Sequence, residues 1–208
     1  MLFICILIIL VFKKLIKMLF KSFDHHILFR SFFCLFISTL SMGISIINWN
    51  ILLKNPLETN NLSLVSNNLM LGYMIIDTIH YLYKQNYRID LLLHHFVCLL
   101  IFGLHLDKNI LSFCSINEIL SSFNWIGIIY PNLEWISKIL RLLSILFVRL
   151  FVWIFTLFFL SNSQPRIFQI AFILVFFFVC LDVYWIGIII KNCLGYKNII
   201  KENIKITG

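Results

Sequence analysis

Long apolar stretches, separated by short polar connections, make up most of this 208-residue sequence. About 20 apolar residues in an α-helix cover the roughly 30 Å hydrocarbon core of a bilayer. Inside that core only helices and closed barrels satisfy their backbone hydrogen bonds, and barrel strands would show short segments of alternating polarity. The length and continuity of the apolar stretches therefore predict an all-α, polytopic transmembrane helical bundle with six or seven spans.

Seven apolar segments are the expected spans. They are Leu2–Phe12, Ser31–Leu53, Leu62–Tyr83, Ile89–Leu106, Ile110–Tyr130, Ile139–Leu160 and Ile167–Ile190. The first is short and lacks a basic leading region and a small-residue cleavage site, so we expect a reverse anchor or an interfacial segment rather than a signal peptide. We divide the chain into a hydrophobic N-terminal segment with its basic connection (1–26), a transmembrane domain (27–192) and a basic tail (193–208). No internal repeat of the transporter type is evident.

Charged residues are scarce and lie mainly at the edges of the apolar stretches. They form 12% of the chain, against about 25% in soluble domains, which argues against a soluble protein. The net charge of +8 arises at these edges, a placement that suits membrane orientation and anionic lipid headgroups better than nucleic acid. We therefore expect membrane lipids, and no nucleic acid, as partners.

Basic residues are unequally divided between the two sides of the predicted bundle. One side collects thirteen lysines and arginines, in regions 13–30, 84–88, 138–141 and 191–205, and the other has Lys54, Lys108 and Arg166. Because cytosolic connections carry the excess of basic residues, we expect the richer side and the C-terminal tail to be cytosolic. Arg149 belongs to neither side, since it lies inside a predicted span.

Several polar side chains fall inside the predicted spans, where a central charge costs roughly 2.5–3.5 kcal/mol. They are Asp77, His80, His94, His95, Asn117, Glu118, Asn124, Arg149, Gln169 and Asp182. Counted from the span ends, Asp77, the two adjacent histidines and Asp182 lie roughly 8–12 Å from the cytosolic edge. Arg149 and Asn124 fall in similar layers, and Glu118 lies nearer the midplane. One reading is interhelical hydrogen bonding, and the other, which we favour, is a functional cavity.

The adjacent His94 and His95 are the strongest candidates for chemistry. Neighbouring helical residues point about 100° apart, so one can face a cavity while the other packs against another helix. Neutral imidazole suits proton transfer, acyl transfer or metal binding. A zinc site with His80 and Asp77 has no recognised spacing, so we expect no metal cofactor. We expect His25 and His26 to be interfacial, and likewise His105.

Read together, motifs in chain order resemble the TLC domain family of membrane proteins. The matching segments are Asn55-Pro56-Leu57, Gly72-Tyr73 with Asp77, Asp90 with His94-His95, Asn117 to Ser122 with Asn124, Leu146 to Phe151 around Arg149, and Asp182-Val183-Tyr184-Trp185. This resemblance covers roughly 27–192. It implies a helical domain around a lipid-accommodating cavity, usually in the endoplasmic reticulum, where some members are ceramide synthases and others regulate lipids or act in trafficking.

The resemblance also implies roles for the polar residues. His94 or His95 would act as base or acyl carrier and Asp77 or Asp182 would orient it, with acyl-CoA as co-substrate of an N-acyltransferase. The substrate would be bound by Glu118, Asn124, Arg149, Tyr184 and Trp185. Two departures bring the chain nearer the non-synthase branches: Cys34 stands where many members have histidine, and the acidic cluster that follows the paired histidines in synthases is reduced to Asp107 and Glu118. A non-enzymatic lipid-binding or trafficking protein is the alternative.

Overall fold

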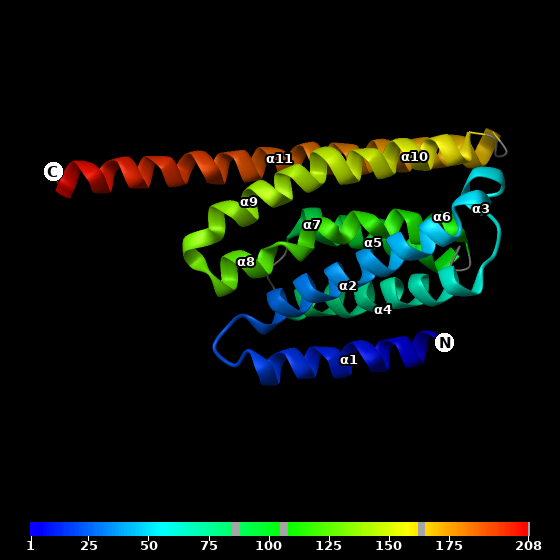
Figure 1. Cartoon of the computed structure of the whole chain (residues 1–208), viewed down its shortest axis with the longest axis horizontal. Helices are drawn as coiled ribbons and strands as arrows, with labels where there is room; N and C mark the ends of the chain where they lie inside the picture. Colours follow the sequence, from blue (N-terminus) through cyan, green and yellow to red (C-terminus); the bar gives the residue numbers. More distant parts are fainter. Residues whose placement is uncertain (85–87, 105–107, 162–164, 208) are drawn as a thin grey trace.

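The described part of the chain is a bundle of roughly parallel and antiparallel helices (Figure 1). The computed structural model describes residues 1–84, 88–104, 108–161 and 165–207, and side chains through 192 except that of residue 104. The helices are α1 (Leu2–Leu19), α2 (His25–Ile47), α3 (Trp49–Lys54), α4 (Asn61–Tyr83), α5 (Ile89–Leu104), α6 (Asn109–Cys114), η1 (Ser115–Glu118), α7 (Ile119–Ser122), α8 (Asn124–Ile129), η2 (Pro131–Leu133), α9 (Glu134–Leu143), η3 (Ser144–Arg149), α10 (Leu150–Leu160) and α11 (Pro165–Thr207).

Four helical segments are long and apolar enough to cross a membrane: His25–Ile47, Asn61–Tyr83, Pro131–Leu160 and Pro165–Asn192. A shorter apolar helix covers Ile89–Gly103. The helical architecture is therefore compatible with an integral membrane protein, while the count of six or seven spans stays a prediction.

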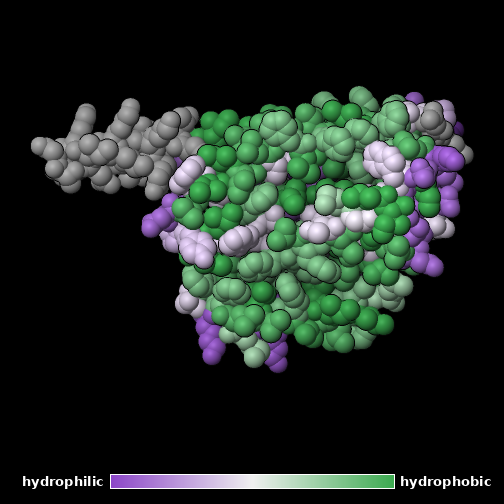
Figure 2. All heavy atoms as spheres, in the orientation of Figure 1, coloured by the Kyte–Doolittle hydropathy of each residue, from purple (hydrophilic) through white to green (hydrophobic). Residues whose placement is uncertain are grey.

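The surface of the bundle is apolar where a soluble protein would be polar. Apolar side chains cover the wide middle of the face seen in Figure 2, and hydrophilic ones gather towards its two ends. Large side chains such as Phe147, Ile173 and Phe176 are 64–70% exposed. Exposed apolar area on this scale marks contact with lipid or with a partner protein.

Helix α1 is longer than the sequence predicted and packs along the bundle. It runs to Leu19 rather than Phe12 and buries Cys5, Ile9 and Ile16. A Cβ added to Gly72 of α4 would lie 3.0 Å from Cδ1 of Ile9, so the small residue permits this close approach. Residues 2–19 thus form one helix that packs against α4. The three lysines of α1 lie in its C-terminal half.

The expected fifth span, Ile110–Tyr130, is interrupted rather than continuous. The 3₁₀ turn η1 separates α6 from α7, and α8 follows after another break. Side chains compete for the backbone here, since the Ser115 hydroxyl donates to Leu111 O (3.0 Å) and the Ser122 hydroxyl to Ile119 O (2.6 Å). The interruption places Glu118 at the end of a tight turn that faces α2 and α5.

The sixth segment contains a π-helical turn, η3, between α9 and α10. Arg149 ends this turn and is only 2% exposed. A π turn inserts an extra residue into the helical ladder and changes the direction of the side chains around it, as is common at functional sites. Here it directs the Arg149 guanidinium into the bundle.

Candidate functional site

Two polar ladders face each other across α2 and α4. His26, Arg30 and Cys34 are spaced four residues apart on α2, as are Tyr73, Asp77 and Tyr81 on α4. Residues four apart share one helix face, so each ladder is a stripe along its helix. The stripes contact each other through Arg30 Nη1, which donates to the Tyr81 hydroxyl (2.8 Å), and through the Cys34 thiol, which donates to the Tyr73 hydroxyl (3.3 Å).

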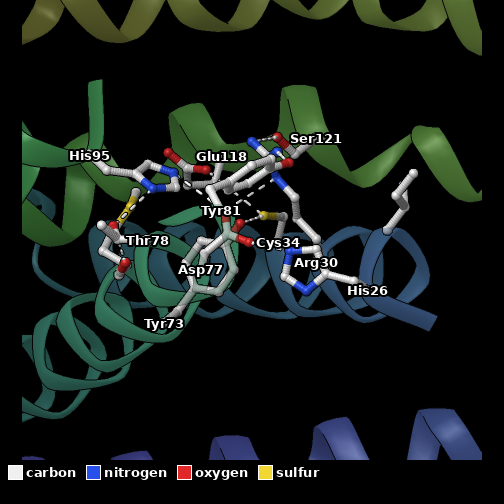
Figure 3. Close-up of polar contacts among 12 residues, drawn as sticks. His26, Arg30, Cys34, Tyr73, Asp77, Thr78, Tyr81, His95, Glu118 and Ser121 are labelled. Atoms are coloured by element: carbon white, nitrogen blue, oxygen red, sulfur yellow. Dashed lines mark hydrogen bonds and ion pairs between the residues drawn. The ribbon is translucent and has the colours of Figure 1, made fainter. Parts of the chain in front are cut away.

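Asp77 is the centre of the first site, which we name the Asp77 cluster: His26, Arg30, Asp77 and His95 (Figure 3). Its carboxylate is fully buried, with His26 Nε2 at 2.8 Å, His95 Nε2 at 3.4 Å and Arg30 Nε at 3.7 Å. Two helices, α2 and α5, therefore direct three nitrogen atoms at one carboxylate of α4. A buried anion needs such compensation, because an unpaired charge away from water is very costly.

His26 is not the interfacial residue that the sequence predicted. Helix α2 begins at His25, six residues before the expected span, because the Asp24 carboxylate accepts hydrogen bonds from the backbone N–H groups of His26 (3.0 Å) and Ile27 (3.1 Å). The earlier start brings His26 onto the buried face, where it is 6% exposed and its ring stacks on His80 with centroids 3.3 Å apart. The predicted boundary between the N-terminal segment (1–26) and the transmembrane domain (27–192) consequently falls inside α2.

The two adjacent histidines diverge as their spacing on a helix predicted. His95 turns towards α4, where its Nδ1 lies 3.1 Å from the Thr78 hydroxyl. His94 turns the other way, with Nε2 at 3.4 Å from Glu118 Oε1 and 3.8 Å from the Cys98 thiol. We name His94 and Glu118 the junction pair. Both are 6% exposed or less.

An apolar cavity of about 110 Å³ opens on one side of the junction pair. Its wall is built mainly by α5, α6, α10 and α11, and the shared feature of its lining is small or apolar side chains. The lining includes Met70, Cys98, Ile101, Phe102, Ile110, Cys114, Trp153, Ala171, Val175 and Phe178, together with His94 and Glu118. Such a lining suits a hydrocarbon chain.

The same pair also lines a polar cavity of about 160 Å³. Four arginines, a phenol, a hydroxyl and an amide distinguish its lining. The lining comprises Ile27, Arg30, Tyr81, Arg88, Leu91, His94, Glu118, Leu120, Ser121, Asn124, Arg141, Arg149 and Trp185. His94 and Glu118 thus line both cavities, and the pair stands where a hydrophobic compartment meets a cationic one.

Arg149 and Asp182 form a separate ion pair between η3 and α11. Arg149 Nε lies 2.8 Å from Asp182 Oδ1, and the Trp153 indole donates to Asp182 Oδ2 at 3.0 Å. Arg149 Nη1 also donates to the Asn117 carbonyl at 3.0 Å. Asp182 lines neither cavity. It therefore holds Arg149 in place from behind and contacts neither histidine in the described contacts.

Of the remaining predicted site residues, Asn124 and Trp185 face the polar cavity and Tyr184 faces away from it. Trp185 lines the polar cavity and donates to Asp90 Oδ2 at 2.8 Å. Asn124 also lines it and donates to the Ser121 carbonyl at 3.0 Å. Tyr184 is 53% exposed and lines neither cavity, because it precedes Trp185 by one residue and points away around the helix.

Sequence reasoning missed the arginines of the polar cavity other than Arg149. In the sequence Arg30, Arg88 and Arg141 indicate only membrane orientation, because they lie at the edges of apolar stretches, whereas the structure places all three in the lining of the polar cavity. The four-residue spacing of His26, Arg30 and Cys34 was the available signal for the α2 ladder. Among the described residues, no group of three or more His, Cys, Asp or Glu side chains is arranged to hold a metal ion.

The junction pair joins an imidazole and a carboxylate in the linings of both cavities. His94 Nδ1 has no hydrogen-bond partner among the described residues, so one ring nitrogen is not engaged by the protein. The chain matches no protein-family model, no curated protein and no solved structure. Membership of the TLC family accordingly stays a prediction that rests on the motif residues.

Proposed function

We propose that this chain is an integral membrane protein that binds a lipid inside the bundle and presents it to His94 and Glu118. One observation carries the proposal: the same two residues line both the apolar and the polar cavity. A lipid chain in the first cavity and its polar end in the second would cross the junction pair. Each part of the ligand would then meet a lining of its own polarity.

Retention of lipid by the purified full-length chain tests this proposal. Native mass spectrometry after detergent extraction would detect lipid that survives removal of the surrounding bilayer. Ala171→Phe fills the apolar cavity from α11 and is expected to reduce retained lipid strongly. Ile173→Phe is the matched control, because Ile173 lies on the same helix and is 66% exposed. Equal retention by the two variants would show that the lipid is bound to the outer surface only, and the proposal would be wrong.

A second candidate is N-acyl transfer of the ceramide-synthase type, which the TLC resemblance implies. The observation in its favour is the contact between His94 and Glu118 at the cavity boundary. In such a step the amine nitrogen attacks the thioester carbonyl carbon, the new C–N bond forms as the C–S bond breaks, and the amine proton passes through His94 to the leaving thiolate. Glu118 would stabilise the transient imidazolium.

Lipid analysis of cells that lack their own ceramide synthases separates the two candidates. Cells expressing the wild-type chain would gain new ceramides if it is an acyltransferase, and the His94→Ala variant would abolish them at equal protein level. A change in phospholipid chains without ceramide would favour a lipid-regulating protein in the endoplasmic reticulum. No lipid change, with protein verified in the membrane, would favour the trafficking alternative.

A further inference from the structure

The four arginines of the polar cavity come from four different parts of the chain. Arg30 lies on α2, Arg88 directly before α5, Arg141 on α9 and Arg149 at the end of η3. Their convergence on one cavity of about 160 Å³ is a tertiary arrangement that neither one helix face nor one loop could produce. Four cationic side chains beside a hydrophobic cavity need an explanation beyond membrane orientation.

Three of these arginines are balanced by carboxylates that lie outside the cavity lining. Arg30 Nε is 3.7 Å from Asp77, Arg88 Nη2 is 2.5 Å from Asp90 and Arg149 Nε is 2.8 Å from Asp182. Because none of these carboxylates lines the cavity, each arginine is held from behind by its acid. Glu118 is the one acidic residue in the described lining.

Two guanidinium nitrogens remain without an acceptor in the described part of the chain. Arg141 has no ion-pair partner there, and its buried Nε–H finds no acceptor. Arg149 is 2% exposed, and its Nη2 is likewise buried without an acceptor. Buried N–H donors left unsatisfied cost free energy, so an anionic ligand at this position would supply what the protein does not.

We propose that the polar cavity binds the phosphate group of an amphiphilic ligand whose chain occupies the apolar cavity, with Arg141 and Arg149 as the principal donors. This inference rests on the proposed function and names the class of ligand. A phosphate offers three strong acceptor oxygens and up to two charges. The planar guanidinium fork matches those oxygens. A carboxylate offers two oxygens and one charge, which is fewer than two arginines with nearby Tyr81, Ser121 and Asn124 can engage.

Two sources carry a phosphate next to an apolar chain: a lipid headgroup, and the phosphates of coenzyme A on an acyl thioester. The chemistry recognised is the same, so the inference concerns the phosphate, and the two sources are distinguished by experiment.

Lipid competition on the purified full-length chain in nanodiscs tests the inference. The probes are phosphatidic acid and diacylglycerol with identical chains, measured by native mass spectrometry, with coenzyme A added as competitor. We expect preferential retention of phosphatidic acid, reduced roughly tenfold in Arg141→Gln because one charge-assisted contact is lost. Arg141→Lys, which keeps the charge and loses the fork, should lie between the two. Lys138→Gln, one turn earlier on α9, is the control and should bind as wild type.

Each outcome has a separate meaning. Displacement of phosphatidic acid by coenzyme A would assign the phosphate to the thioester source, and resistance to it would assign the lipid headgroup. Equal retention of phosphatidic acid and diacylglycerol, unchanged by Arg141→Gln but lost in Ala171→Phe, would overturn the phosphate and leave the lipid-binding function intact. Retention of neither lipid would overturn both. Unchanged thermal stability of Arg141→Gln and Arg141→Lys shows that the comparison concerns binding.

Discussion

His94 and His95 are consecutive residues, yet they belong to polar sites of different kinds. His95 faces Asp77, which is fully buried and lines neither cavity, whereas His94 faces Glu118, and both of these line the two cavities. A contact between a histidine and a carboxylate thus occurs once in a closed cluster and once in the lining of two cavities. The difference indicates that the Asp77 cluster holds α2, α4 and α5 together, whereas the junction pair borders space that a ligand would occupy under the proposed function.

Removal of the Asp77 carboxylate should have the largest effect on stability. Asp77→Ala leaves Arg30 without its acid and removes the contact partner of His26 and His95. Loss of one partner in a buried ionic cluster costs about 3–5 kcal/mol. The free energy of unfolding, measured for the purified chain in mixed detergent micelles, should fall by that amount. Glu118→Gln, which keeps an acceptor for His94, is the comparison and should cost much less. If both variants lost the same free energy of unfolding, the Asp77 cluster and the junction pair would not differ in their contribution to stability.

Asp182 offers a second closed contact, between η3, α10 and α11. Asp182→Asn removes the charge that balances Arg149 but retains an acceptor for the Trp153 indole. A charge-assisted hydrogen bond contributes about 1.5–3 kcal/mol, and stability should fall within that range. Because Arg149 would lose its anchor, phosphate-bearing ligands should also bind less well. A stability change without any change in lipid retention would show that Arg149 does not contact the ligand.

The two histidines provide the most direct test of the comparison. His95→Ala should lower stability by about 1–2 kcal/mol, since a buried contact with Asp77 and Thr78 is lost. His94→Ala should change stability less, yet it should reduce lipid retention or product formation more. For each variant, the measured quantity is the amount of retained lipid divided by the amount of folded protein. Reversal of the order would place the functional histidine in the Asp77 cluster.

The helical bundle could be predicted from the sequence because apolar stretches specify helices in lipid regardless of detail. The divergence of His94 and His95 also followed from the helical period alone. Which carboxylate each histidine faces did not follow, because depth along a span fixes a layer but not the rotation of the helix. The break at Ser115–Glu118 could not be predicted from hydropathy either, because serine hydroxyl groups that bond to nearby carbonyls interrupt the helix without changing its apolar content.

Asp24 provides the smallest test, since it acts on the Asp77 cluster only through the start of α2. Partial burial opposes ionisation of its carboxylate, but hydrogen bonds from the Ile27 and His26 backbone N–H groups outweigh it, and the pKa of Asp24 lies below its ordinary value. Asp24→Ala should cost about 1 kcal/mol, and because the folded pKa is lowered, this contribution is present at neutral pH and is lost as the pH falls through that pKa. Asp24→Asn, which still caps but does not titrate, should remove the pH dependence while retaining most of the stability. If Asp24→Ala instead lowered the free energy of unfolding as much as Asp77→Ala, the position of His26 would depend on the start of α2. The contacts within the Asp77 cluster would then not be enough to hold it together.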